Sequence, residues 1–295
     1  MTASKKAISK TPAELIEIAF NETSDFATTL AKGLALLDCF TVQHLVLSNA
    51  ELATATGLKR PTVARLTYTL EELGYLVRAS GGFRLGRKIL TVAHPLLSSF
   101  TVRQLARPLM QELASDVRGT VSIGVLDGCN LIYVETARSG DGASHLPDIG
   151  STLPLLGTAL GRALIAMLPD AERAALETRM AREYPDLWKD RRAALSEDIR
   201  SCHRRGFSVS HGDWVQDIFA VGTPLFHDPN LGYLAINCGV PAFRLRAHEL
   251  EDEIGPRLTK LAATIRALCG HNSQLQQVAT LRPRPQRARP GGRTA

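Results

Sequence analysis

The chain has 295 residues, of which 44% are hydrophobic and 22% charged, and this composition is ordinary for a water-soluble globular protein. The length predicts two domains with tails, and neither a bilayer-spanning run of ~20 apolar residues nor a secretory signal is found. The five cysteines are scattered without a C-x-x-C pair, which predicts a protein of the reducing cytoplasm with no disulfide frame, zinc site or other metal.

The formal net charge of +6 is unevenly distributed along the chain. Residues 26–90 carry eight Lys or Arg and four Asp or Glu, and the last fifteen residues carry five Arg and no acid. The stretch between them is nearly neutral. This distribution favours a nucleic-acid-binding module attached to a domain with a different task.

Residues 1–25 lack a core pattern and are expected to form a flexible arm, and residues 26–90 follow as a winged helix-turn-helix domain. Ser48 and Glu51 have the spacing of a capping box at a helix start, and Gly57 can adopt the positive φ that ends that helix. Pro61 suits the first turn of the next helix. Leucines 30, 34 and 37 are expected to form the inward face of an earlier helix.

The second helix of the motif is expected to be a recognition helix. Val63, Leu66, Leu70 and Leu73 recur at helical spacing and are expected to pack inward, and the opposite face is polar and cationic. A hairpin with glycines at its tip follows and supplies basic residues to a wing. The candidate DNA-binding residues of helix and wing are Lys59, Arg60, Pro61, Thr62, Arg65, Tyr68, Thr69, Arg78 and Arg84.

A helical linker over 91–108 is expected next, within a helical stretch that extends to Val117 and breaks near Ser98–Ser99. Residues 109–270 then combine β-branched runs with amphipathic helices. The strands are not in regular βαβ alternation, so we expect an antiparallel α+β sensor domain. Residues 271–295 are expected to be a disordered basic tail, either a nonspecific DNA-contacting arm or a solubilising terminus.

From about Thr29 to Leu268 the chain resembles the IclR family of bacterial transcriptional regulators. The matching segments occur in family order in both domains. They include Thr56-Gly-Leu58 in the turn, Leu73-Gly-Tyr-Leu76 and Phe83-Arg-Leu-Gly86 in the wing, and Thr158-Ala-Leu-Gly161 and Arg204-Arg-Gly-Phe207 beyond it. The resemblance implies a GAF-like C-terminal domain that binds a small organic or aromatic acid. It also implies dimers or dimers of dimers on double-stranded operator DNA.

The resemblance further implies an effector pocket lined by the segment 153–161 and by strand residues beyond it. The candidate effector-binding residues are Leu155, Gly157, Thr158, Ala159, Leu160, Ser210, Phe219, Ala220, Asn237 and Gly239. Small residues at 157–159 leave room for a ligand at a helix start, where a carboxylate is favoured, or they serve only close helix packing. Many family members carry Asp at the position of Ser210 and Cys at that of Ala220, so this pocket is expected to be less polar and to suit an aromatic or other weakly polar carboxylate better than a small keto acid.

The favoured function is therefore an effector-responsive regulator that controls a catabolic operon, without catalytic residues or a cofactor. Two alternatives remain open. One is an enzyme on the C-terminal domain targeted by the DNA-binding module, although neither a G-x-S-x-G elbow, a P-loop nor a dinucleotide fingerprint occurs. His211 and Asp213 are the one candidate acid/base pair. The other alternative is a nonspecific architectural DNA binder, favoured by the arginine-rich tail. The sequence leaves open which effector and operator are bound, and whether binding represses or activates.

Overall fold

The computed structural model describes residues 12–13, 16–17, 25–140 and 148–280, the last ten of these by their backbone alone. The predicted N-terminal arm and the basic tail beyond residue 280 therefore lie almost wholly outside the described residues. The chain divides into two compact units, one of Met1–Phe100 with Pro169–Ala193 and one of Thr101–Leu168 with Ala194–Ala295. No helix in the described ranges is long and apolar enough to cross a bilayer.

The first unit contains the helix-turn-helix, made of α2 (Thr28–Leu37), α3 (Asn49–Thr56) and α4 (Arg60–Glu72). The predicted capping box at the start of α3 is present. The Ser48 amide donates to Glu51 Oε2 at 2.8 Å, and the Glu51 amide donates back to Ser48 Oγ at 3.2 Å. Gly57 ends the helix at a φ of 75°, as its position predicts.

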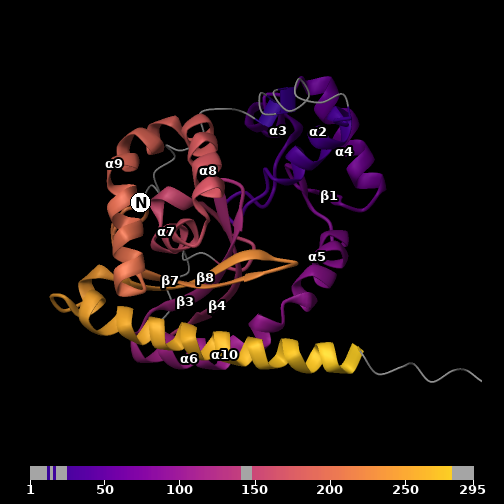
Figure 1. The fold of residues 1–295 in the computed structure, drawn as a ribbon. Coiled ribbons are helices and arrows are strands. Elements are labelled where there is room, and N and C mark those ends of the chain that lie inside the picture. The colour runs from indigo at the N-terminus through magenta and orange to yellow at the C-terminus, as the bar shows by residue number, and fades with distance from the viewer. Residues whose placement is uncertain (1–11, 14–15, 18–24, 141–147, 281–295) are drawn as a thin grey trace, which may run out of the picture. The chain divides into compact units, whose positions relative to one another are not determined.

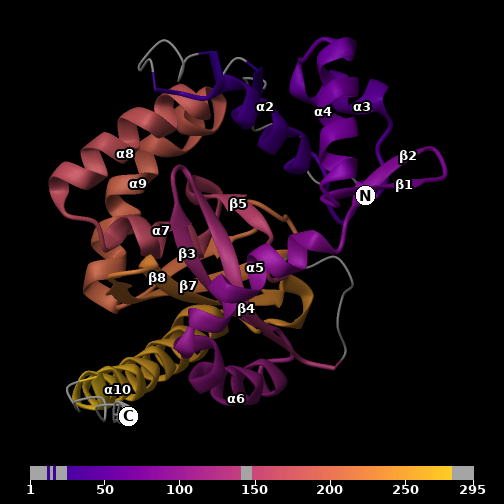
Figure 2. The same cartoon turned by 90° about the vertical axis from the view of Figure 1, so that its right-hand side faces the viewer.

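The wing is a hairpin of β1 (Leu76–Ala79) and β2 (Gly82–Leu85), and Figure 2 shows it beside the lower ends of α3 and α4. Leu47 lies against β2 as a third, single-residue strand, because its amide and carbonyl both bond to Phe83 at 2.9 Å. A Cβ at Gly82 would lie 2.3 Å from the Leu47 carbonyl oxygen, so glycine is required for this close approach. The hairpin predicted after the recognition helix is thus confirmed, and it is tied to the start of α3.

The prediction that Leu30 and Leu34 form the inward face of α2 is wrong. Leu30 and Leu34 are 64% and 53% exposed, whereas Leu36 is fully buried. The core of the motif is formed by Leu36, Leu47, Leu52, Val63 and Leu66. Helical spacing fits a stripe through Leu36 as well as one through Leu34, so periodicity alone did not choose between them. Leu73, which was expected to face inward, caps α4 and is 52% exposed.

The predicted break in the linker region is confirmed. Helix α5 (Lys88–Ser99) is the last element of residues 1–100 in the first unit, and α6 (Thr101–Asp116) is the first element of the second unit. Phe100 alone separates the two helices. Pro108 lies inside α6 without ending it. The first unit also includes α8 (Asp170–Glu183) and the start of α9 (Pro185–Arg205).

The second unit contains a six-stranded antiparallel sheet in the order β5-β4-β3-β8-β7-β6. Helices α6 and α10 cover one face, and α7 lies on the other (Figure 1). This confirms the mixed α and β class expected for the C-terminal part. The elements are β3 (Thr120–Asp127), β4 (Asn130–Arg138), β5 (Thr152–Pro154), η1 (Leu155–Gly157), α7 (Ala159–Ala166), β6 (Ser208–His211), β7 (Ile218–Asp228), β8 (Gly232–Pro241), η2 (Ala242–Arg244), η3 (Leu250–Ile254) and α10 (Gly255–Thr280).

The C-terminal helical segment differs from its predicted bounds at both ends. We expected it to begin at Arg246, but regular helical structure starts with the π turn at Leu250 because His248 adopts a positive φ of 63°. Helix α10 continues to Thr280, so the boundary predicted at residue 270 falls inside a helix.

Two glycines let α7 pack closely against the preceding turn η1 and against the sheet. A Cβ at Gly161 would lie 2.1 Å from the Leu155 carbonyl oxygen, and one at Gly222 would lie 2.4 Å from the Ala159 carbonyl oxygen. The close helix packing considered for the small residues near Thr158 is therefore carried by Gly161, which lets η1 approach α7, and by Gly222 on β7, which lets the sheet approach α7.

Candidate ligand pocket and nucleic-acid interface

A pocket lies within the second unit, between the start of α7, the strands β3, β4, β7 and β8, and the loop that joins β6 to β7. Its empty space is about 630 Å³, and this volume includes the part open to solvent. The lining residues are Thr120, Ser122, Tyr133, Leu153, Gly157, Thr158, Ala159, Ser210, Trp214, Val215, Ile218, Ala220, Asn237 and Gly239.

Most of the predicted effector-binding residues lie in this lining, namely Gly157, Thr158, Ala159, Ser210, Ala220, Asn237 and Gly239. Leu155 and Leu160 do not, because both are fully buried in the core around α7. Phe219 does not either. Successive side chains of a strand point to opposite faces of the sheet, so Phe219 lies on the face away from Ala220 and the pocket. Its ring packs edge-on against the His211 ring, with 5.1 Å between the ring centres.

Several lining residues were not predicted, because strand pairing brings them to the pocket. Thr120 pairs with Gly239 and Ser122 with Asn237 across β3 and β8. Ile218 precedes Ala220 by two residues and so faces the same side, a relation that strand periodicity could have predicted. The pairing of β3 with β8 joins segments more than a hundred residues apart, and the sequence carried no indication of it.

The polar groups of the pocket are neutral. Among its described lining residues there is no Lys, Arg, His, Asp or Glu. Tyr133 and Asn237 share a side-chain hydrogen bond, and burial raises the pKa of the Tyr133 hydroxyl, which therefore stays protonated. Thr136 donates from its hydroxyl to Ser122 Oγ at 3.1 Å. The lining therefore offers hydroxyl and amide groups on an otherwise apolar surface.

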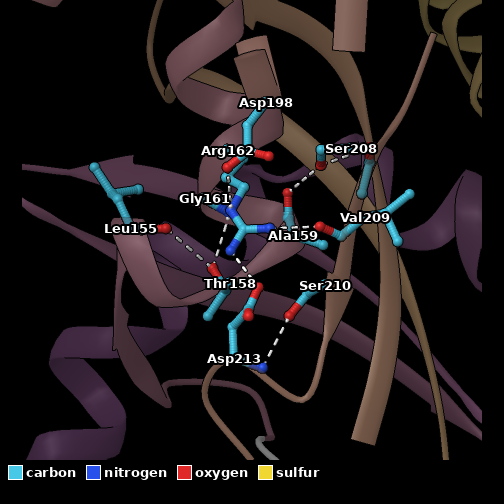
Figure 3. Close-up of polar contacts among 11 residues, drawn as sticks. Leu155, Thr158, Ala159, Gly161, Arg162, Asp198, Ser208, Val209, Ser210 and Asp213 are labelled. Carbon is cyan, nitrogen blue, oxygen red and sulfur yellow. Dashed lines mark hydrogen bonds and ion pairs between the residues drawn. The ribbon is translucent and has the colours of Figure 1, made fainter. Parts of the chain in front are cut away.

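Thr158 begins α7 and places the first turn of that helix at the pocket. Its Oγ1 accepts a hydrogen bond from the Gly161 amide at 2.9 Å, which makes it an N-cap (Figure 3). The amides of Ala159 and Leu160 in the same turn have no intrahelical acceptor. A helix start with unsatisfied amides attracts anions, so this end of the pocket is suited to a carboxylate.

Behind the pocket, Arg162 is 4% exposed and binds three segments through one guanidinium group. It donates to the Val209 carbonyl oxygen on β6 and to the Asp213 carboxylate in the loop after β6, and its Nε lies 3.3 Å from Asp198 Oδ2 (Figure 3). Arg162 was not among the site residues predicted from the sequence. A single basic residue in the apolar run of α7 was the available indication that it had a buried partner.

Trp214 follows Asp213 and reaches the pocket beside Gly157. A Cβ at Gly157 would lie 2.8 Å from Trp214 Cε3, so the indole occupies space that any larger residue at position 157 would take. Gly157 is therefore a lining residue whose size makes room for an aromatic ring.

The candidate acid/base pair of His211 and Asp213 is not assembled. His211 Nε2 lies 2.9 Å from Glu251 Oε1, and Asp213 binds Arg162. No group of three or more His, Cys, Asp or Glu in the described part of the chain could hold a metal ion.

The nucleic-acid interface predicted on α4 is largely accessible. Lys59, Arg60, Pro61, Arg65, Tyr68 and Thr69 are exposed and Thr62 is half-buried. The two wing arginines differ. Arg78 forms an ion pair with Glu71 at 2.9 Å and lies over the Phe83 ring, whereas Arg84 is exposed and forms no ion pair within the described residues. Arg84 is thus the wing cation available to a phosphate.

Two family models match the chain, one in its N-terminal part and one in its C-terminal part. The family model described as the IclR helix-turn-helix domain matches residues 29–80, and the model described as the bacterial transcriptional regulator IclR C-terminal domain matches residues 94–267.

Individual proteins match over most of their length. A solved structure of an IclR family transcriptional regulator from Brucella abortus is 38% identical, with a TM-score of 0.74 over 83% of this chain and 94% of that one. The Pca regulon regulatory protein of Pseudomonas putida is 28% identical and covers 88% of each chain. The p-hydroxybenzoate hydroxylase transcriptional activator of Acinetobacter baylyi is 27% identical over 83% of this chain and 93% of its own.

Proposed function

The chain belongs to the IclR family of bacterial transcriptional regulators, and we propose that it binds operator DNA as a homodimer or dimer of dimers under the control of an aromatic or other weakly polar carboxylate. The family assignment makes it a DNA-binding regulator that responds to a small-molecule effector.

DNA recognition is assigned to α4 and the wing. Arg65, Tyr68 and Thr69 lie on the exposed face of α4, and short polar and cationic side chains on such a face read base edges in the major groove. Lys59 and Arg60 at the helix start and Arg84 on the wing are placed to contact phosphates.

The neutral lining of the pocket is the observation that carries the effector class. A small keto acid is polar at most of its atoms and would leave the apolar wall formed by Leu153, Trp214 and Ile218 without a partner. An acid with one ring meets that wall with its ring and the first turn of α7 with its carboxylate. The similarity to the p-hydroxybenzoate hydroxylase transcriptional activator supports the aromatic class. A lining without carboxylate, imidazole, thiol or amine favours ligand binding over catalysis.

The dimer is supported by the surface of α5. None of its residues is buried within the described chain, and Leu90, Val92 and Leu96 are 69%, 60% and 57% exposed. Three large apolar side chains on one linker helix are suited to packing against the same helix of a second copy. Ligand binding would then favour one spacing of the two DNA-binding domains.

Footprinting on the intergenic region beside the gene, combined with calorimetric titration of aromatic and keto acids, tests the proposal. We expect protection of a discrete, nearly palindromic site, and affinity for aromatic acids that exceeds that for pyruvate and glyoxylate. Uniform protection of random DNA would indicate an architectural binder. Tight binding of glyoxylate or pyruvate alone would refute the effector class.

A further inference from the structure

We propose that Trp214 selects a flat ring in the pocket and that Arg162 is the positioning residue that holds Trp214 there. The inference rests on the proposed function, because it presumes that an acid occupies this pocket. It assigns the selection among acids to one side chain and its support.

The position of the indole relative to the carboxylate end of the pocket carries the first half of the inference. The Trp214 ring lies against Gly157, since a Cβ added at Gly157 would be 2.8 Å from Trp214 Cε3. The next residue, Thr158, is the N-cap of α7. A carboxylate at the first turn of α7 therefore has the indole directly beside it. A ring attached to that carboxylate meets the aromatic surface of Trp214, and paired aromatic rings gain more than their buried area alone provides.

The loop between β6 and β7 carries the indole of Trp214. Val215, Gln216 and Asp217 in this loop are exposed, so neighbouring side chains supply little packing. Backbone hydrogen bonds hold its end, from the Ile218 amide to the Val215 carbonyl oxygen at 2.9 Å and from the Ala242 amide to the Asp217 carbonyl oxygen at 2.8 Å, and an ion pair holds its start. Asp213, adjacent to Trp214, accepts a hydrogen bond from the buried guanidinium of Arg162 (Figure 3).

Arg162 is itself fixed independently of the loop. Its guanidinium also donates to the Val209 carbonyl oxygen and pairs with Asp198, so it cannot follow the loop if the loop moves. The Asp213 amide adds a bond of 3.4 Å to Ser210 Oγ, and Gly212 makes the turn at a φ of 80°. Removing the Asp213 carboxylate would break the ion pair between Arg162 and Asp213, which anchors the loop directly before Trp214.

The test compares two acids with the same number of carbons, flat benzoate and puckered cyclohexanecarboxylate, by calorimetry on the full chain. The variants are Trp214→Leu, Asp213→Ala and the conservative Asp213→Asn, which keeps an acceptor for Arg162. Asp217→Ala is the matched control, since it removes an exposed carboxylate from the same loop. Trp188→Phe provides a background in which Trp214 is the only tryptophan, because the chain has two.

We expect the parent to prefer benzoate, and Trp214→Leu and Asp213→Ala to reduce that preference by roughly three- to tenfold. Asp213→Asn and Asp217→Ala should keep it. In the single-tryptophan background, acrylamide should quench Trp214 more strongly after Asp213→Ala than after Asp213→Asn, while thermal melts establish that each variant folds. Unfolding of Asp213→Ala would leave Trp214→Leu and the Asp213→Asn quenching to decide.

The outcomes separate this inference from the proposed function. A benzoate preference that is absent in the parent, or unchanged in Trp214→Leu and Asp213→Ala, would overturn the inference and leave the regulator and its pocket intact. A parent that binds neither acid would overturn the proposed effector class, and this inference with it.

Discussion

Tyr133 and Glu135 are two residues apart on β4 yet face opposite sides of the sheet. The register shifts between them, since Gly124 pairs with Tyr133 and the preceding Ile123 pairs with Glu135. Val134 is therefore the extra residue of a β-bulge, and such bulges redirect side chains next to binding sites. Tyr133 points into the pocket, and Glu135 points to α6.

Replacing Glu135 with Gln is expected to lower the free energy of unfolding by about 1–3 kcal/mol. The Glu135 side chain is 2% exposed and binds Arg103 at 3.0 Å and Arg107 at 2.6 Å. The loss of stability is expected to be smaller than for a buried charge left without a partner, because the Arg107 side chain is 59% exposed and water can hydrate it. Urea unfolding of the variant measures it. Arg107→Ala is the control and should cost less, so an equal or larger loss there would contradict the buried role of Glu135.

Arg162→Met is expected to destabilise the second unit more, by about 3–5 kcal/mol, because it leaves two carboxylates and a carbonyl without their shared donor. Arg200→Met removes a solvent-exposed arginine paired with Glu197 on α9 and should change stability by only ~0.5 kcal/mol. Thermal and urea unfolding of the two variants side by side provide the comparison. Similar losses would show that burial of the Arg162 pairs contributes nothing extra.

Gly157→Ala is expected to displace the Trp214 indole and to weaken binding of an aromatic acid. The added methyl group would lie 2.8 Å from Trp214 Cε3, and a side chain can yield where a backbone cannot, so the fold should persist. Tryptophan emission in the Trp188→Phe background reports the displacement. Gly140→Ala is the matched control, since a Cβ there meets nothing within 4 Å. Unaltered emission together with unaltered affinity would mean that the indole is not confined by Gly157.

What the sequence predicted correctly depends on residues close together in the chain. Ser48, Glu51 and Gly57 define the start and end of α3, and the break between α5 and α6 lies beside the expected Ser98–Ser99. The inward face of α2 was mispredicted, because the packing partner decides between two stripes of similar spacing.

The pocket was predicted on α7 and on β6, β7 and β8, and its residues on β3 and β4 were missed. The segment 157–159 carries its own local pattern, whereas Ser122 reaches the pocket only through the pairing of β3 with β8. Tyr133 requires the bulge at Val134, which shifts it relative to simple alternation. Arg162 was missed because its partners lie more than thirty-five residues away in sequence, and only the folded arrangement brings them together.

The capping box gives a prediction on pH. The hydrogen bond from the Ser48 backbone amide, and after it the bond from the Ser48 hydroxyl, hold the pKa of the Glu51 carboxyl below its ordinary value of 4.5. A group whose pKa is lower in the folded state stabilises the fold above its unfolded pKa and loses that contribution as pH falls through the folded pKa. Ser48→Ala removes the hydroxyl bond and keeps the amide bond, so it should raise the Glu51 pKa part of the way toward 4.5 and make the DNA-binding domain somewhat less sensitive to acid below that pH. NMR titration of Glu51 in both proteins measures the shift, and an unchanged pKa would contradict the capping role.

The exposed arginines of the DNA-binding domain should differ in what their removal changes. Arg65 lies on the exposed face of α4, so Arg65→Ala is expected to cost about 1–3 kcal/mol on the operator and to relax preference at one base position. Arg84→Ala should weaken operator and random DNA alike and reduce the salt slope by about one unit, as loss of one phosphate contact does.

Arg78→Ala is the matched control on the same hairpin. Its guanidinium is already paired with Glu71 at 2.9 Å, so its removal should change the salt slope less than removal of Arg84 does. Fluorescence anisotropy with operator and scrambled duplexes over a range of salt concentrations separates the three variants. Equal losses on both duplexes for Arg65→Ala would reassign that residue to the phosphate backbone. A larger slope change for Arg78 than for Arg84 would mean that DNA displaces Glu71 from its ion pair.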